Sequence, residues 1–237
     1  MAETVAFVGA TGGAGTTRTT LACAELLARE GNDTAVLDAA YGTQGLADRI
    51  DGEIAPDMTE LCLEDEPLES GLVDRTIEGG GRVAVCPARA PFSRLAKAKS
   101  PEAAERFEAR IAEAERGFEY VLIDTPPIAA NQAVAAATTA GAVAVVCDAS
   151  RVESALPRTA DRLEDLGVEG FDAVVTRASD HPDGDVCIPR LEAEPPVLGE
   201  EETARNALVD VIETTTGASV ERGRTGEDGL FEALFFR

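Results

Sequence analysis

Lysine is almost absent from this 237-residue chain, which has only Lys97 and Lys99 among its 21 basic residues. Acidic residues number 44, so the formal net charge is -23. We expect no direct contact with nucleic acid, because a phosphate backbone repels such a surface. An acidic surface is typical either of a site for a basic partner or of adaptation to a saline cytoplasm. The spread of acidic residues along the whole chain favours the saline, halophilic interpretation.

Paired cysteines, long apolar runs and multiple histidines are also lacking. The five cysteines are odd in number and form no C-x-x-C pair, which favours buried thiols in a reducing compartment. No run approaches the ~18 apolar residues of a membrane span, and the N-terminus has no charged and apolar leader. The single histidine, His181, lies in the turn-rich stretch SDHPDGD, where we expect no catalytic role. These absences predict a cytoplasmic protein.

Apolar strand-like runs alternate with helical patterns along the chain. The predicted strands are Val5–Gly9, Thr34–Leu37, Arg82–Cys86, Tyr120–Ile123, Ala142–Cys147, Phe171–Thr176 and a short Val186–Ile188. The predicted helices are Thr17–Arg29, Gln44–Ile50, Met58–Glu64, Pro101–Arg116, Ala129–Ala140, Ser154–Leu166 and Glu200–Thr214. Such alternation predicts an α/β fold, a parallel sheet with helices on both faces. We expect one domain over residues 1–214, followed over 215–237 by a polar linker and a short amphipathic C-terminal segment.

The stretch VAFVGATGGAGTTRTTLA, residues 5–22, has the order of a phosphate-binding loop. A strand ends at Gly9, a glycine-rich turn follows, and a helix begins near Thr17. Glycines allow backbone N–H groups to face a phosphate, and the N-terminus of the helix adds partial positive charge. The alternative is that the glycines serve only a tight strand–helix connection. The predicted phosphate contacts are Gly12, Gly13, Ala14, Gly15, Thr16 and Thr17.

A second motif, FEYVLIDTPPIAANQA, places Asp124 at the carboxyl end of a hydrophobic strand. Ligands bind at this edge of open α/β sheets. A carboxylate there, together with the hydroxyl of Thr17, is the pattern that holds Mg²⁺ beside phosphates. The alternative is that Asp124 only caps the following turn, whose shape is set by Thr125 and the two prolines after it.

These motifs resemble the MinD/ParA group of deviant Walker A ATPases, including its CpaE/TadZ-like branch. That family has K-G-G-x-G-K-[ST] where this chain has TGGAGTT, Thr11 to Thr17. The resemblance spans nearly the whole sequence and includes TAVLDAAYGTQGL, YVLIDTPPIA and VVTRAS. It implies a P-loop NTPase fold of the SIMIBI type and binding of ATP or ADP with Mg²⁺. It also implies metal ligation by Thr17, Asp38 and Asp124, and nucleotide contacts from Thr176 and Arg177.

Three departures from the family pattern affect the site. Thr11 replaces the signature lysine that in the family reaches a partner's nucleotide, and Thr16 replaces the lysine on the β- and γ-phosphates. Ala40 stands where the family has a second aspartate that positions water. Loss of one charge-assisted contact, about 1.5–3 kcal/mol, weakens binding roughly 10- to 150-fold. Arg18, about 100° around the helix from Thr17, could contact phosphate from the side, serve a dimer interface or be a solvated arginine.

The sequence therefore predicts a MinD/ParA-like positioning or scaffolding factor that binds nucleotide weakly and hydrolyses little or none. One alternative is an active ATPase whose cation comes from Arg18, Arg151 or a partner, and another is a structural subunit with an empty pocket. We expect a protein partner and a monomer or weak homodimer. The apolar residues of the tail segment 230–236 predict reversible, peripheral association with a membrane surface or a partner protein, or else docking onto the domain.

Overall fold

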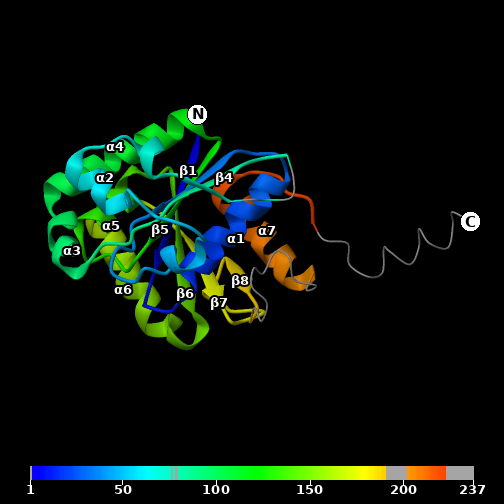
Figure 1. The fold of residues 1–237 in the computed structure, drawn as a ribbon. Coiled ribbons are helices and arrows are strands. Elements are labelled where there is room, and N and C mark those ends of the chain that lie inside the picture. Colours follow the sequence, from blue (N-terminus) through cyan, green and yellow to red (C-terminus); the bar gives the residue numbers. More distant parts are fainter. Residues whose placement is uncertain (1, 76, 78–79, 191–201, 223–237) are drawn as a thin grey trace, which may run out of the picture.

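The computed structural model describes residues 2–75, 77, 80–190 and 202–222, and its described part is built on an eight-stranded sheet (Figure 1). The strands lie in the order β3-β4-β2-β5-β1-β6-β7-β8. Their bounds are β1 Glu3–Gly9, β2 Thr34–Asp38, β3 Val73–Arg75, β4 Val83–Cys86, β5 Tyr120–Thr125, β6 Ala142–Asp148, β7 Asp172–Thr176 and β8 Val186–Ile188. Neighbouring strands are parallel except β3, which is antiparallel to β4. The predicted α/β fold is confirmed, with one antiparallel strand at the edge.

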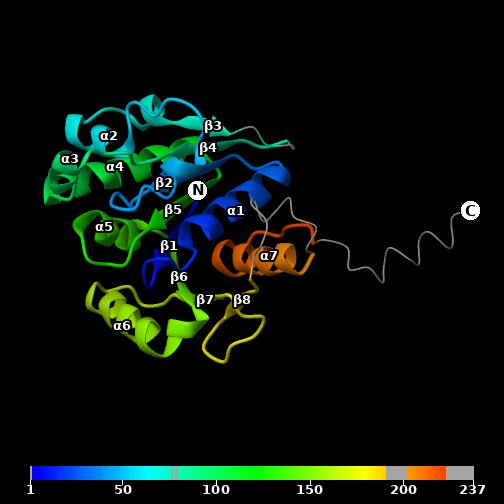
Figure 2. The same cartoon turned by 60° about the horizontal axis from the view of Figure 1, so that its bottom comes forward.

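Helices cover both faces of the sheet (Figure 2). One face carries α1 Thr16–Arg29 and α7 Glu202–Thr216, and the other carries α4 Pro101–Gly117, α5 Asn131–Thr139 and α6 Val152–Asp165. The shorter helices are α2 Met58–Glu64 and α3 Phe92–Ala98, together with the 3₁₀ turns η1 Ala47–Arg49, η2 Leu68–Gly71 and η3 Ala149–Arg151.

The central strands are apolar on both sides, as a sheet covered on both faces requires. In β1, Phe7 packs in the core beneath α1 and α7, whereas the next residue, Val8, packs in the core beneath α5 and α6. The register then aligns the carboxyl ends of three strands: Phe7 pairs with Asp124, and Asp38 also pairs with Asp124. The loop after β1 and the two carboxylates therefore meet at one edge of the sheet.

Three short elements differ from the sequence predictions. The helix predicted over Gln44–Ile50 is only the turn η1, because Gln44 has a left-handed backbone (φ 54) that interrupts a helix. The strand β3 was not predicted, since its three residues are too few to show alternation. The helix α3 was not predicted either, and it carries Phe92, whose side chain is 90% exposed.

Asp57 connects helix α2, the chain after β4 and helix α3. Its side chain caps α2 by accepting hydrogen bonds from the backbone N–H groups of Thr59 (2.7 Å) and Glu60 (3.1 Å), and the Glu60 side chain completes the capping box. The second carboxylate oxygen accepts from the backbone N–H of Arg89 (3.2 Å) and from the Arg94 guanidinium (3.1 Å). Asp57 is only 1% exposed, so all these donors depend on one buried group.

The cysteines and the end of α7 complete the fold. All five cysteines are free, and four of them are buried, as predicted, while Cys187 is half-buried. Helix α7 runs to Thr216, and Val220 beyond it is buried in the core under α1 and α7. The tail segment 230–236 lies outside the described residues. In the part of the chain that the structure describes, no helix has the length and apolar character needed to cross a membrane.

Candidate phosphate-binding site

The loop between β1 and α1 has the backbone geometry of an anion cradle. Gly13 (φ 77) and Gly15 (φ 96) adopt left-handed conformations that favour glycine. A Cβ atom on Gly9 would lie 2.7 Å from the Thr16 hydroxyl, so any larger residue at the strand end would displace the Thr16 side chain. Gly15 is the N-cap residue of α1, and no side chain caps this end. The N-terminus of α1 therefore faces the loop without a side-chain cap, the arrangement in which a helix N-terminus can bind an anion.

Contacts from the end of β7 hold the loop in place. The Thr176 hydroxyl donates a hydrogen bond to the Ala14 carbonyl (2.7 Å), and the Arg177 guanidinium donates to the Gly13 carbonyl (3.1 Å). Arg177 also forms an ion pair with Asp148 at the end of β6. The structure thus brings both predicted residues, Thr176 and Arg177, to the loop, where their contacts are with its backbone.

The two residues predicted to hold Mg²⁺ beside phosphate are in direct contact. The Thr17 hydroxyl donates a hydrogen bond of 2.6 Å to an oxygen of Asp124, which is 1% exposed. Burial raises the pKa of Asp124 to about 6, against the lowering effects of the Thr17 hydrogen bond and the charge of Arg49. Mg²⁺ prefers oxygen ligands and typically takes only one or two from protein. These two oxygens fit that requirement.

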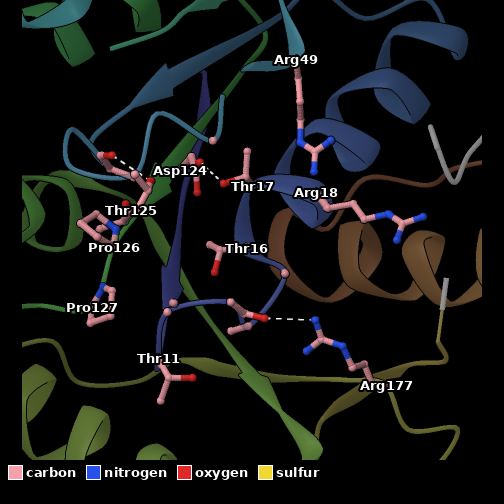
Figure 3. Close-up of a pocket in the computed structure, with 18 residues that line it drawn as sticks. Thr11, Thr16, Thr17, Arg18, Arg49, Asp124, Thr125, Pro126, Pro127 and Arg177 are labelled. Atoms are coloured by element: carbon pink, nitrogen blue, oxygen red, sulfur yellow. Dashed lines mark hydrogen bonds between the residues drawn. The ribbon is translucent and has the colours of Figure 1, made fainter. Parts of the chain in front are cut away.

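A cavity of about 370 Å³ lies in front of this pair (Figure 3). Its lining comprises residues 11–18 of the loop and the start of α1, Ala40, Thr43 and Gly45 after β2, Arg49 in η1, residues 124–127 at the end of β5 and just after it, Arg177, and Gly9. Its size is within the range of small-molecule sites. The hydroxyl of Thr11 is buried and has no hydrogen-bond partner among the described residues, so the site contains a polar atom that a ligand could satisfy.

No protein-family model matches the sequence, and no curated protein matches it. Solved structures do match. The septum site-determining protein MinD complexed with Mg-ADP from Pyrococcus horikoshii superposes with a TM-score of 0.71 at 17% identity, over 90% of this chain and 96% of that one. The chain has the fold of MinD.

Two further structures agree with this result. The MinC:MinD cell division protein complex of Aquifex aeolicus matches with a TM-score of 0.70 at 22% identity, over 94% of this chain and 99% of that one. Cobyrinic acid a,c-diamide synthase from Mycobacterium smegmatis, with bound ATP analog and magnesium, matches with a TM-score of 0.68 at 19% identity, over 94% and 100%. Matches at these identities concern the fold, so the predicted P-loop NTPase architecture of the MinD type is confirmed.

Within this MinD fold, Asp38 lies at the end of β2, where it pairs with Asp124 in the sheet register. It is fully buried and does not line the cavity, although the resemblance implied a third metal ligand here. Its carboxylate oxygens accept hydrogen bonds from the backbone N–H groups of Ala40 (2.7 Å) and Ala88 (2.9 Å). Burial and the nearby charge of Asp124 raise the pKa of Asp38 to about 8. These contacts tie the end of β2 to the chain after β4.

Arginine supplies the positive charge in the described lining of the cavity, which includes no lysine. Arg18 extends away from the loop, as its place on the helix predicted (Figure 3). Arg49 was not predicted from the sequence, because it belongs to no phosphate-binding motif and comes from a three-residue turn. The only signal was its position in the segment TAVLDAAYGTQGLADR, which follows β2 toward the same edge of the sheet.

Proposed function

We propose that this protein is a MinD/ParA-like positioning or scaffolding factor that binds ATP or ADP with Mg²⁺ weakly and hydrolyses little or none. The observation that carries the proposal is the Thr17–Asp124 hydrogen bond beside an uncapped helix N-terminus, in a cavity whose described lining has no lysine. The MinD of Pyrococcus horikoshii, which has the same fold, is complexed with Mg-ADP.

The phosphates would lie against the backbone of the glycine-rich loop. Helix dipole and N–H groups there favour an anion without any lysine. Thr17 and Asp124 would hold the metal ion. Bound Mg²⁺ would neutralise part of the phosphate charge, and the loop and these two oxygens would set where the phosphates and the ion lie.

Weak binding and slow hydrolysis follow from the lack of lysine in the glycine-rich loop and of an aspartate at position 40. Phosphoryl transfer depends on positive charge against the developing anion and on a positioned nucleophile. The methyl group of Ala40 lines the cavity and cannot orient a water molecule. Thr11 cannot reach across to a second copy as a lysine could, so we propose a monomer or a weak homodimer. The biological activity would then lie in binding a protein partner, with the tail segment 230–236 as a second contact to a partner or a membrane surface.

An active ATPase is the second candidate, because three arginines line the cavity and could replace the missing lysine. Three measurements on the same samples in molar KCl distinguish a weak binder, an active ATPase and a structural subunit. Calorimetry with Mg-ATP measures binding, phosphate release measures hydrolysis, and light scattering measures the mass. We expect measurable heat, negligible phosphate release and a mass that changes little with ATP. Steady turnover would establish the ATPase instead, absence of heat would leave a structural subunit, and a tight ATP-dependent dimer would contradict the weak-dimer proposal.

Replacing Thr16 by lysine is expected to tighten Mg-ATP binding at least several-fold. Thr16 lines the cavity at the start of α1, where a lysine would add a charge-assisted contact to phosphate. The measurement is the dissociation constant by calorimetry. Thr139→Lys is the matched control, because Thr139 is exposed at the end of α5 and gains the same charge away from the cavity. Equal affinities for Thr16→Lys and wild type would indicate that the loop has closed on itself.

A further inference from the structure

The three arginines that line the cavity differ in what their side chains can reach. The Arg177 guanidinium is engaged by Asp148 and by the Gly13 carbonyl. Arg18 extends away from the loop and also lines a neighbouring cavity beside β8 (Figure 3). Arg49 instead descends from η1 toward the first turn of α1, on the side of Thr17 (Figure 3). Of these three, Arg49 is the arginine directed at the place where phosphate and metal would lie.

The fold holds the backbone of Arg49 in a defined position. Leu46 is fully buried, and its carbonyl accepts a hydrogen bond of 3.0 Å from the backbone N–H of Arg49. The Arg49 carbonyl accepts from the guanidinium of Arg75 (3.3 Å), which forms a 2.8 Å ion pair with Glu25. Glu25 is 3% exposed and lies in α1. The turn that presents Arg49 is thus connected to α1, the helix that follows the glycine-rich loop.

The segment that leads into this turn also contacts the first turn of α1. A Cβ atom on Gly45 would lie 3.3 Å from the Thr17 hydroxyl, so the chain after β2 passes close to this proposed metal ligand. The backbone path and the shared lining of the cavity place Arg49 beside the Thr17–Asp124 pair (Figure 3).

We propose that Arg49 supplies, from an element outside the loop, the positive charge for the nucleotide phosphates that the loop itself lacks. The proposal rests on the nucleotide binding proposed above. A guanidinium presents several N–H donors in a planar fork that matches phosphate oxygens, and it stays charged at any physiological pH. In this arrangement the affinity for nucleotide depends on the position of the chain after β2, so that segment would respond to whether phosphate is bound.

The test is calorimetry of Mg-ATP binding to wild type and Arg49→Ala. We expect the dissociation constant to rise roughly 10-fold or more, as for loss of one charge-assisted contact. Arg116→Ala is the matched control, since Arg116 is exposed at the end of α4 and its loss changes the net charge equally. We expect that variant to bind within twofold of wild type. If thermal melting shows that Arg49→Ala has lost stability, Arg49→Gln takes its place, because it keeps two of the three side-chain methylenes and the backbone contact but removes the charge.

A second experiment tests whether a lysine in the loop can replace Arg49 in nucleotide binding. Adding Thr16→Lys to the Arg49 variant should restore affinity to at least the wild-type value. Equal Mg-ATP affinity of wild type and the Arg49 variant would overturn this inference and leave the proposed function standing. Absence of Mg-ATP binding by wild type would overturn both. Equal weakening by Arg116→Ala would also overturn it, because the effect would then come from net charge alone.

Discussion

Replacing Gly15 by valine is expected to abolish measurable binding of Mg-ATP and Mg-ADP. Gly15 has a φ of 96°, a conformation that is strained for any residue with a Cβ atom and most of all for a β-branched one. It is also the N-cap residue of α1, where a bound phosphate is predicted to lie against the backbone. The new Cβ atom would lie 3.7 Å from the Thr176 side chain, which holds the loop. We expect the affinity for nucleotide to fall more than about 100-fold, as it does when two hydrogen bonds to a charged group are lost.

Calorimetry measures this loss, with thermal melting to confirm that the variant is folded. Gly170→Val is the matched control, because a Cβ atom at Gly170 meets nothing within 4 Å and its φ is not in the left-handed region. We expect the control to bind as wild type does. Undiminished binding by Gly15→Val would place the nucleotide somewhere other than this loop.

Replacing Asp57 by alanine is expected to lower the free energy of unfolding by about 2–3 kcal/mol, because α2 loses its buried cap and the Arg89 N–H loses its acceptor. The loss includes the cap of α2, typically ~1 kcal/mol, and it leaves the Arg89 N–H and the Arg94 guanidinium without this acceptor. Arg94 keeps one ion pair, with Glu60. Because α2 and α3 both depend on this contact, we expect them to loosen together.

Urea denaturation followed by circular dichroism measures this change. Asp57→Asn should fall between wild type and alanine, since an amide can still cap α2 but no longer faces Arg94 with a negative charge. Asp161→Ala is the matched control on the exposed side of α6, and we expect a change within about 0.5 kcal/mol. A loss below about 1 kcal/mol for Asp57→Ala would show that water replaces these hydrogen bonds.

The sequence was sufficient for the central part of the fold and for the Thr17–Asp124 pair. Buried parallel strands show as continuous apolar runs, and the ends of such runs meet at one edge, so the loop and Asp124 could be placed together. The contacts of the Asp38 side chain could not be predicted, because its partner Ala88 lies 50 residues away, in the loop after β4. Thr176 likewise contacts Ala14 across 162 residues.

Arg49 shows a different limit of sequence patterns. Its segment has the composition of a short helix, but Gln44 has a left-handed backbone and Arg75 contacts the Arg49 carbonyl in the short turn that lines the cavity. Neither feature follows from periodicity, since one is a local conformation uncommon outside glycine and the other comes from an edge strand of three residues. The sequence motif therefore predicts where the site lies, whereas the charged residues that line it also come from segments outside the motif, such as the turn that carries Arg49.

The two edge strands of the sheet affect how copies of this protein can associate. In the described part of the chain, the outermost strands β3 and β8 have three residues each, whereas β1 and β6 inside have seven. A long open edge is a template on which another chain can add a strand, the step that leads to domain swapping and fibrils. Edges this short offer few unpaired main-chain groups. Self-association of this protein should therefore be governed by side-chain contacts, and it should remain reversible and responsive to single surface substitutions.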